Sequence, residues 1–293
     1  MSTEATVELN LGAELGEGPL WDAAEQTLYW VDITGKTLYR YHPASGRNEA
    51  YPLGRRVGTV ALRRSGGVLV ALDNGFAAYD LARRELTLLA DPEAHLPQTR
   101  FNDGKVGPDG RFWAGTMLEG ERRGDEGSLY YLDVDLSVDK VLAGIGISNG
   151  LAWSLDEKTL YFVDSMTFSV QAFDYDAAAG TLANGRRVIT VAEELGTPDG
   201  MTIDEEGMLW VAHWGGWAVR RWNPHTGALL ASIALPVAQV TACTFGGPAL
   251  DVLYITTAGG WLSAEQQAAQ PLAGALFSVV PGVRGLPAYR FAG

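Results

Sequence analysis

At the starts of predicted strands, four side chains that can supply oxygen ligands each stand directly before a glycine. They are Glu17, Asp103, Asn149 and Asp199, and Asn102 immediately precedes Asp103. Carboxylate and amide oxygens are hard ligands that suit Ca²⁺, Mg²⁺ or Mn²⁺ and do not exclude Fe²⁺ or Zn²⁺. Glu17, Asn149 and Asp199 together carry a charge of −2, which one divalent cation would neutralise. Three protein ligands would also leave positions open for water and substrate, as in catalytic metal sites.

The same pairs have a second interpretation, because Asp-Gly and Asn-Gly are most often simple turns. Carboxylates that converge without a cation would also repel one another or take up protons. Spacing alone therefore leaves two hypotheses open, a metal site or ordinary turns at the starts of strands. The choice depends on whether the fold brings these residues together.

A repeat in the chain provides such a fold. Six short apolar or aromatic runs recur at intervals of about 40 to 50 residues, the usual length of a propeller blade. They cover residues 28–32, 68–72, 111–115, 160–164, 209–213 and 253–257. Weaker runs flank each copy, and turns rich in Asp, Asn, Pro and Gly separate them, which is typical of β-hairpins. Four strands in each of six units predict an all-β, six-bladed β-propeller. The alternative is a β-sandwich or two stacked sheets.

The propeller geometry places the candidate ligands. The innermost strand of each blade begins at one face of the ring, and the connection from the second to the third strand returns to that face. The ligand-Gly pairs fall at the starts of four innermost strands, so they should meet at the mouth of the central channel. The connections 118–127 and 259–273 should overhang this face and set specificity. Either 6–11 or 288–291 should supply the strand that completes the last blade, and 263–269 should be the one helix, with Ser263 as its N-cap.

Composition narrows the classes of function. The 293 residues carry a net charge of −13, which disfavours nucleic acids and anionic membranes as partners. Cys243 is the only cysteine, so an intrachain disulfide and a Cys-based zinc site are excluded. Residues 1–12 lack the pattern of a signal peptide, and no apolar run reaches about 18 residues. We expect a cytoplasmic protein with a single domain over residues 1–293.

Several longer motifs carry a family resemblance. They cover residues 15–21, 100–105, 114–117, 147–154, 198–201 and 245–247. Through them the chain resembles the senescence-marker-protein/regucalcin/gluconolactonase family, which includes bacterial sugar lactonases. The match extends from Leu15 to the C-terminal residues.

This resemblance implies a six-bladed propeller with one divalent metal ion that hydrolyses a sugar lactone, an aldonolactone, to the aldonic acid. It implies Glu17, Asn149 and Asp199 as the metal ligands. It also implies that Arg100, Asn102 and Glu119 contact the substrate. The connection that carries Glu119 is shorter and more charged than its counterpart in regucalcin.

The expected mechanism is metal-assisted acyl hydrolysis. The cation would polarise the lactone carbonyl, and either the cation or Asp199, acting as a general base, would activate the attacking water. Arg100 and Asn102 would orient the hydroxyl groups of the sugar. Two other functions stay open, namely another metal-dependent esterase such as an organophosphate hydrolase, and a non-catalytic propeller that binds calcium or a protein.

Some residues near the predicted mouth allow two interpretations each. Asp103 could support the ligands or only form a turn, and Arg100 could contact substrate or form a structural ion pair with Glu119. His213 ends a second strand at the site face, where a structural hydrogen bond is the simpler role. Trp214 and Trp217 follow that strand and could belong to the core or wall the mouth.

Overall fold

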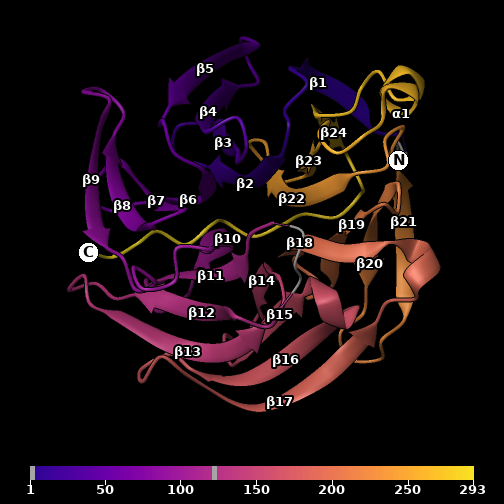
Figure 1. The fold of residues 1–293 in the computed structure, drawn as a ribbon. Helices are drawn as coiled ribbons and strands as arrows, with labels where there is room; N and C mark the ends of the chain where they lie inside the picture. Colours follow the sequence, from indigo (N-terminus) through magenta and orange to yellow (C-terminus); the bar gives the residue numbers. More distant parts are fainter. Residues whose placement is uncertain (1–3, 121–123) are drawn as a thin grey trace.

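Six four-stranded antiparallel sheets surround a central axis in the computed structural model, which describes residues 4–120 and 124–293 (Figure 1). Strands make up 56% of the structure and helices 4%, far below the helix content of roughly one-third in an average protein. The predicted six-bladed propeller is therefore confirmed, and the sandwich alternative is wrong. None of the helices in the described ranges is long and apolar enough to span a membrane.

The strands of each blade follow one another from the axis outward, except in blade six. Blade one contains β2 (Gly16–Asp22), β3 (Thr27–Asp32), β4 (Thr37–His42) and β5 (Arg47–Pro52), and blade two contains β6 (Val57–Leu62), β7 (Val68–Leu72), β8 (Gly75–Asp80) and β9 (Glu85–Ala90). Blade three contains β10 (Thr99–Val106), β11 (Phe112–Leu118), β12 (Gly127–Leu132) and β13 (Val138–Ile145), and blade four contains β14 (Ser148–Trp153), β15 (Thr159–Asp164), β16 (Ser169–Asp176) and β17 (Thr181–Thr190). Blade five contains β18 (Thr197–Ile203), β19 (Leu209–Trp214), β20 (Ala218–Trp222) and β21 (Leu229–Ala234), and blade six contains β22 (Val240–Gly246), β23 (Val252–Thr257), β24 (Ala275–Val279) and β1 (Thr6–Asn10).

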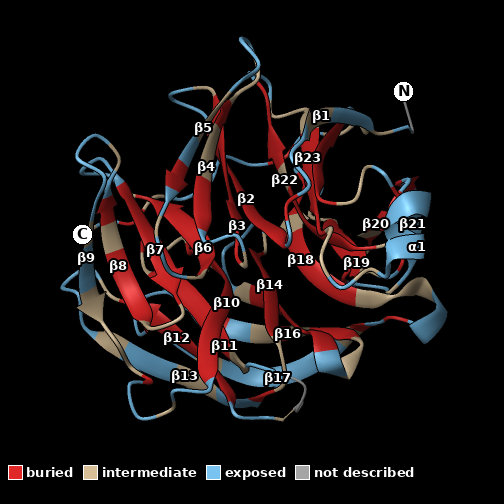
Figure 2. Ribbon diagram, turned by 45° about the horizontal axis from the view of Figure 1, so that its top comes forward, coloured by how far each residue is buried: buried red, intermediate tan, exposed pale blue. Residues whose placement is uncertain are grey.

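Burial decreases from the axis to the rim (Figure 2). Every residue of the inner strands β2, β6 and β14 is buried, whereas the outer strands such as β21 are mostly exposed. The aromatic residues of the second strands fill the spaces between blades. Trp113 of blade three packs edge-on against Trp153 of blade four, and Trp210 of blade five packs against Phe245 of blade six. The repeated aromatic runs are thus the contacts that hold neighbouring blades together.

The N-terminal strand closes the ring. Strand β1 pairs antiparallel with β24, with Thr6 opposite Ser278 and Asn10 opposite Ala275. Of the two segments that could complete the last blade, 6–11 is therefore the one that does so. The helix α1 (Ala264–Ala269) also forms where it was expected, and Ser263 caps it in a capping box with Gln266. Two short 3₁₀ turns lie at Ser165–Thr167 and Glu193–Leu195.

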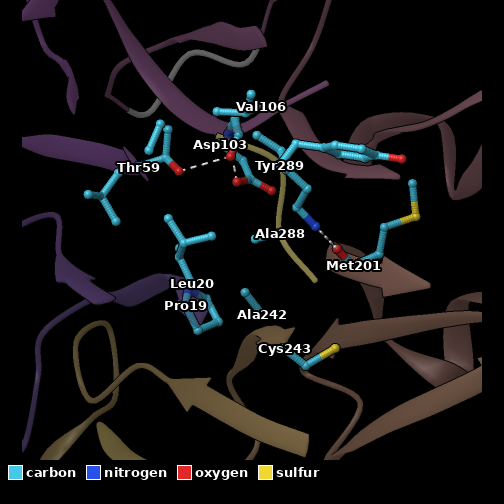
Figure 3. A pocket seen from close by; sticks show the side chains of 15 residues that line it. Pro19, Leu20, Thr59, Asp103, Val106, Met201, Ala242, Cys243, Ala288 and Tyr289 are labelled. Carbon is cyan, nitrogen blue, oxygen red and sulfur yellow. Dashed lines mark hydrogen bonds between the residues drawn. The ribbon is translucent and has the colours of Figure 1, made fainter. Parts of the chain in front are cut away.

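The C-terminal segment has a different role from the predicted strand. It crosses the face of the ring opposite the starts of the innermost strands, from blade six to blade two. At blade six, Gly285 N donates to Leu250 O at 2.8 Å, and at blade two the segment reaches Phe291. Phe291 N donates to Leu62 O at 2.8 Å, and its ring is fully buried between blades two and three. Ala288 and Tyr289 lie against the channel on the way (Figure 3). This segment is a strap across the far end of the channel.

Truncating Phe291 tests how much the strap stabilises the ring. Phe291→Ala should lower the free energy of unfolding by about 3–5 kcal/mol, because it empties a fully buried site. Leu286→Ala, at a residue that is 38% exposed in the same segment, should change it by less than about 0.5 kcal/mol. Urea unfolding of both variants measures the difference, and equal, small effects would show that the strap adds no stability.

Candidate functional site

Each innermost strand has an irregular register near its start. The register shifts lie between Glu17 and Leu20, Val57 and Thr59, Phe101 and Gly104, Asn149 and Leu151, Pro198 and Met201, and Val240 and Ala242. A β-bulge bends a strand and redirects its side chains. All the predicted ligands lie within these irregularities or at their edges. The bulges therefore explain how successive strand residues turn toward the axis.

The glycines after Asn149 and Asp199 allow neighbouring inner strands to approach one another. A Cβ atom on Gly150 would lie 2.8 Å from Asp199 O, and one on Gly200 would lie 2.5 Å from Ala242 Cβ. These distances are shorter than real side chains tolerate, and the atoms struck belong to the next blade. The ligand-Gly pairs are thus a packing requirement of the ring as well as a chemical pattern.

Three carboxylates meet at the mouth of the central channel. Glu17, Asp103 and Asp199 are 5%, 9% and 6% exposed. Burial, followed by the charges of Asp199 and Asp103, raises the pKa of Glu17 well above its ordinary value. Burial and the charge of Asp103 likewise raise the pKa of Asp199. Ionisation of Glu17 and Asp199 at the channel mouth is therefore disfavoured unless a further positive charge is present.

Two oxygen atoms of the site lack a protein partner. Asn149 Oδ1 and Asp199 Oδ1 are buried and accept no hydrogen bond from the described residues. The other end of the amide is fixed, since Asn149 Nδ2 donates to Ser165 Oγ at 3.0 Å and Ser165 Oγ donates to Pro198 O at 2.7 Å. Buried acceptors without partners are costly in native proteins.

The donor set suits a cation, although it is not a conventional carboxylate or histidine cluster. In the described ranges, no three His, Cys, Asp or Glu side chains are arranged to hold a metal ion. Glu17, Asn149 and Asp199 would instead contribute two carboxylates and one amide oxygen. Because two of these oxygens are buried without partners, the residues fit a hard divalent cation.

Lys105 also lies in this region, although the pattern of ligand-Gly pairs did not indicate it. It follows Asp103 by two residues on β10 of blade three, and its Nζ donates to Met201 O of blade five at 2.8 Å. Burial lowers the pKa of Lys105, and the charge of Asp103 opposes that shift. The ammonium group offsets part of the negative charge below the ligands. The two-residue alternation of a strand could have indicated that Lys105 shares a face with Asp103.

The predicted substrate contacts form a connected cluster. Arg100 Nη1 donates to Asn102 Oδ1 at 2.8 Å, and Asn102 Nδ2 donates to Ser148 O at 2.8 Å. Arg100 Nε lies 3.8 Å from Glu119 Oε1, and Glu119 also pairs with Arg56. Burial, followed by the charge of Arg56, lowers the pKa of Arg100 to about 10. The structure thus contains the ion pair between Arg100 and Glu119 that was one of the two interpretations.

Residues 121–123 of the predicted mouth connection 118–127 lie outside the described residues.

His213 has the structural role that was expected. It is fully buried, Trp222 Nε1 donates to its Nε2 at 3.4 Å, and the two rings stack. Burial and the charge of Arg220 lower its pKa to about 3, so the imidazole is neutral at physiological pH. It belongs to the core of blade five and is not part of the ligand set.

The sequence and the fold both match known proteins. A family model described as SMP-30/Gluconolactonase/LRE-like region matches residues 15–259. The chain is 44% identical to regucalcin from Gallus gallus over 286 residues, which cover 95% of each chain.

Two solved structures have nearly the same fold. One is a calcium-binding protein, regucalcin, from Agrobacterium tumefaciens, with a TM-score of 0.94 and 32% identity over 99% of this chain and 97% of the other. The other is a luciferin-regenerating enzyme, with a TM-score of 0.92 and 33% identity over 99% of this chain and 100% of the other.

Ser165 offers a direct test of the ligand arrangement. Ser165→Ala removes the partner of Asn149 Nδ2 and frees the amide to rotate, so affinity for a divalent cation should fall about 10- to 100-fold. Thr167→Ala is a matched control, because its hydroxyl lies in the same turn and donates to Asp164 O. Calorimetric titration of the metal-stripped proteins compares them. Unchanged affinity in Ser165→Ala would separate Asn149 from cation binding.

The raised pKa values predict how the metal-free protein responds to pH. Glu17 and Asp199 bind protons more tightly when folded, so their contribution to stability is fully present below pH about 4 and is lost as pH rises through their raised pKa values. A cation requires the deprotonated ligands. Added cation should therefore raise Tm by an amount that grows as the pH increases from about 5 to 8. In Glu17→Gln this growth with pH should be smaller than in the wild type. An increase that is independent of pH would contradict this linkage.

Proposed function

Because the chain belongs to the SMP-30/gluconolactonase/LRE-like family, we propose that it is a metal-dependent lactonase that hydrolyses an aldonolactone to the aldonic acid. The observation that carries this proposal is the pair of buried, unpartnered oxygens, Asn149 Oδ1 and Asp199 Oδ1. They lie beside Glu17 at the channel mouth and next to a cluster of polar groups suited to a hydroxylated substrate.

Glu17, Asn149 and Asp199 would hold the cation. When bound, a divalent cation supplies Lewis-acid polarisation of the lactone carbonyl and stabilises negative charge on its oxygen. Burial strengthens this electrostatic effect, since water does not screen the site.

Asp199 is the residue that we assign as general base. Its Oδ1 accepts no hydrogen bond from the described residues, so this carboxylate has an atom that could take a proton from the attacking water. Glu17 has a similar environment, but its Oε2 already accepts a hydrogen bond from Gly18 N at 3.1 Å.

Arg100, Asn102 and Glu119 would orient the sugar. Both ends of the Asn102 amide are already engaged within the protein, so this residue would act with its remaining N–H and lone pair. Glu119 is 39% exposed in its side chain and can accept bonds from sugar hydroxyls. A phosphotriester would gain little from these groups, which disfavours an organophosphate hydrolase.

A calcium-binding role without catalysis is the second candidate. The donor set consists of oxygen atoms alone, and a solved relative is described as a calcium-binding protein. The two candidates differ in one observable, turnover of lactones. Metal-stripped protein should be assayed on five- and six-carbon aldonolactones with each divalent cation added back. Cation binding without turnover on any of them would favour the second candidate.

Three substitutions separate the roles of the ligands. Asp199→Asn should reduce kcat by about 10²–10⁴ at saturating metal, the range for loss of a general base. Asn149→Asp should keep or tighten metal binding yet slow the reaction, because a more neutralised cation is a poorer Lewis acid. Glu17→Gln should lose mainly metal affinity, and excess metal should restore its activity. Metal titrations alongside kinetics measure all three, and full recovery of Asp199→Asn in excess metal would leave Asp199 as a ligand only.

A further inference from the structure

The mouth of the channel has an aromatic side that the proposed chemistry does not use. Trp214 ends β19 of blade five, and Trp261 lies in the connection after β23 of blade six. Their rings meet edge-on, with centroids 6.0 Å apart and an interplanar angle of 67°. Trp261 is 66% exposed, the highest value among the large apolar residues that the structure describes as exposed. We name these two residues the tryptophan wall.

The tryptophan wall stands beside the ligand-bearing strands. Trp214 pairs with Thr197, two residues before Asp199 on β18. Gly260, the residue before Trp261, donates its N–H to Glu14 O at 2.9 Å, three residues before Glu17. Trp214 also packs against the cluster that includes Leu15 and Ala258. The two indoles therefore lie beside the segments that lead into Glu17 and Asp199, two of the proposed metal ligands.

Buried polar groups hold the chain that carries the wall. Arg220 Nη2 donates to Gly216 O at 3.1 Å and Nη1 donates to Leu195 O at 2.9 Å, which ties the turn after Trp214 to the loop before Asp199. The connection that carries Trp261 is anchored by Gln270, whose Oε1 accepts a bond from Ala238 N at 2.7 Å. The exposed indole is thus part of an ordered framework, the usual condition for a binding surface.

The elements that carry the wall lie across the ring from those that carry the charged cluster. Arg56, Arg100 and Glu119 come from blades two and three, and blades five and six lie on the opposite side of the ring (Figure 1). A ligand that binds between them meets hydrogen-bonding groups on one side and indole on the other. A sugar ring has these properties, because its hydroxyls project from the edge while its axial C–H bonds form an apolar face.

We propose that Trp214 and Trp261 determine specificity by packing against the C–H face of the lactone ring, while its hydroxyl groups meet the cluster around Arg100. This inference rests on the proposed function for the identity of the ligand. It requires that an axial hydroxyl on the face against the indoles weakens binding, because that hydroxyl loses water without gaining a partner. The wall therefore distinguishes lactones that differ only in the configuration of one hydroxyl.

The test uses hydrolysis-resistant probes and does not depend on turnover. Gluconolactam and its C4 epimer, galactonolactam, replace the ring oxygen with N–H, and their Kd values are measured calorimetrically in wild type, Trp261→Ala and Trp261→Phe. Trp261→Ala should bind gluconolactam about 5- to 10-fold more weakly and lose most of the preference between epimers. Trp261→Phe should retain much of both. Leu230→Ala, at an exposed residue of the outer strand β21, should match wild type.

The outcomes separate this inference from the proposed function. Lactam binding that depends on Trp261, in a protein that hydrolyses no lactone, supports the wall and removes the lactonase assignment. Lactone turnover with equal KM and epimer preference in wild type and Trp261→Ala overturns the wall and leaves the lactonase assignment standing. Failure of wild type to bind either lactam also overturns the wall.

Discussion

Mutual repulsion among buried carboxylates is the constraint around which the centre of this propeller is organised. Glu17, Asp103 and Asp199 come from three different blades, and burial together with their neighbours' charges disfavours ionisation of Glu17 and Asp199. Such an arrangement persists only when the surrounding fold is stable enough to impose it. The closed ring and the tightly packed inner strands provide that stability.

The groups around the carboxylates reduce the electrostatic cost of burying them together, but they do not remove that cost. Lys105 contributes a positive charge from below, and backbone N–H groups such as that of Gly18 donate to the carboxylates. Asn149 and Asp199 nevertheless retain oxygens without protein partners. A site that is fully satisfied by its own protein has little affinity left for a ligand, so in the proposed function these unpartnered oxygens would provide the affinity for a cation.

Much of the architecture could be predicted from the sequence, because each blade repeats the same alternation of aromatic runs and turns. The repeat gave the number of blades and placed Glu17, Asn149 and Asp199 at equivalent positions. It could not choose between 6–11 and 288–291 for ring closure, since both segments have strand-like composition and the choice depends on which edge of β24 is free. The bulges also could not be predicted from the sequence, because their positions depend on how neighbouring strands pair. Ser165 and Trp261 lie in connections, where position is set by tertiary contacts and no periodicity applies.

Closure of the ring by β1 has a consequence for folding of the protein during its synthesis on the ribosome. The partner of β1 is β24 (Ala275–Val279), and Ser278, which pairs with Thr6, is synthesised 272 residues later. At ordinary rates of synthesis, the N-terminal strand waits on the order of 10–50 s for its partner. Throughout that time β1 has no partner in its own blade, so its backbone can pair with other chains. The exposed and polar residues of Thr6–Asn10 suit a segment that must stay unpaired in water until the last blade emerges.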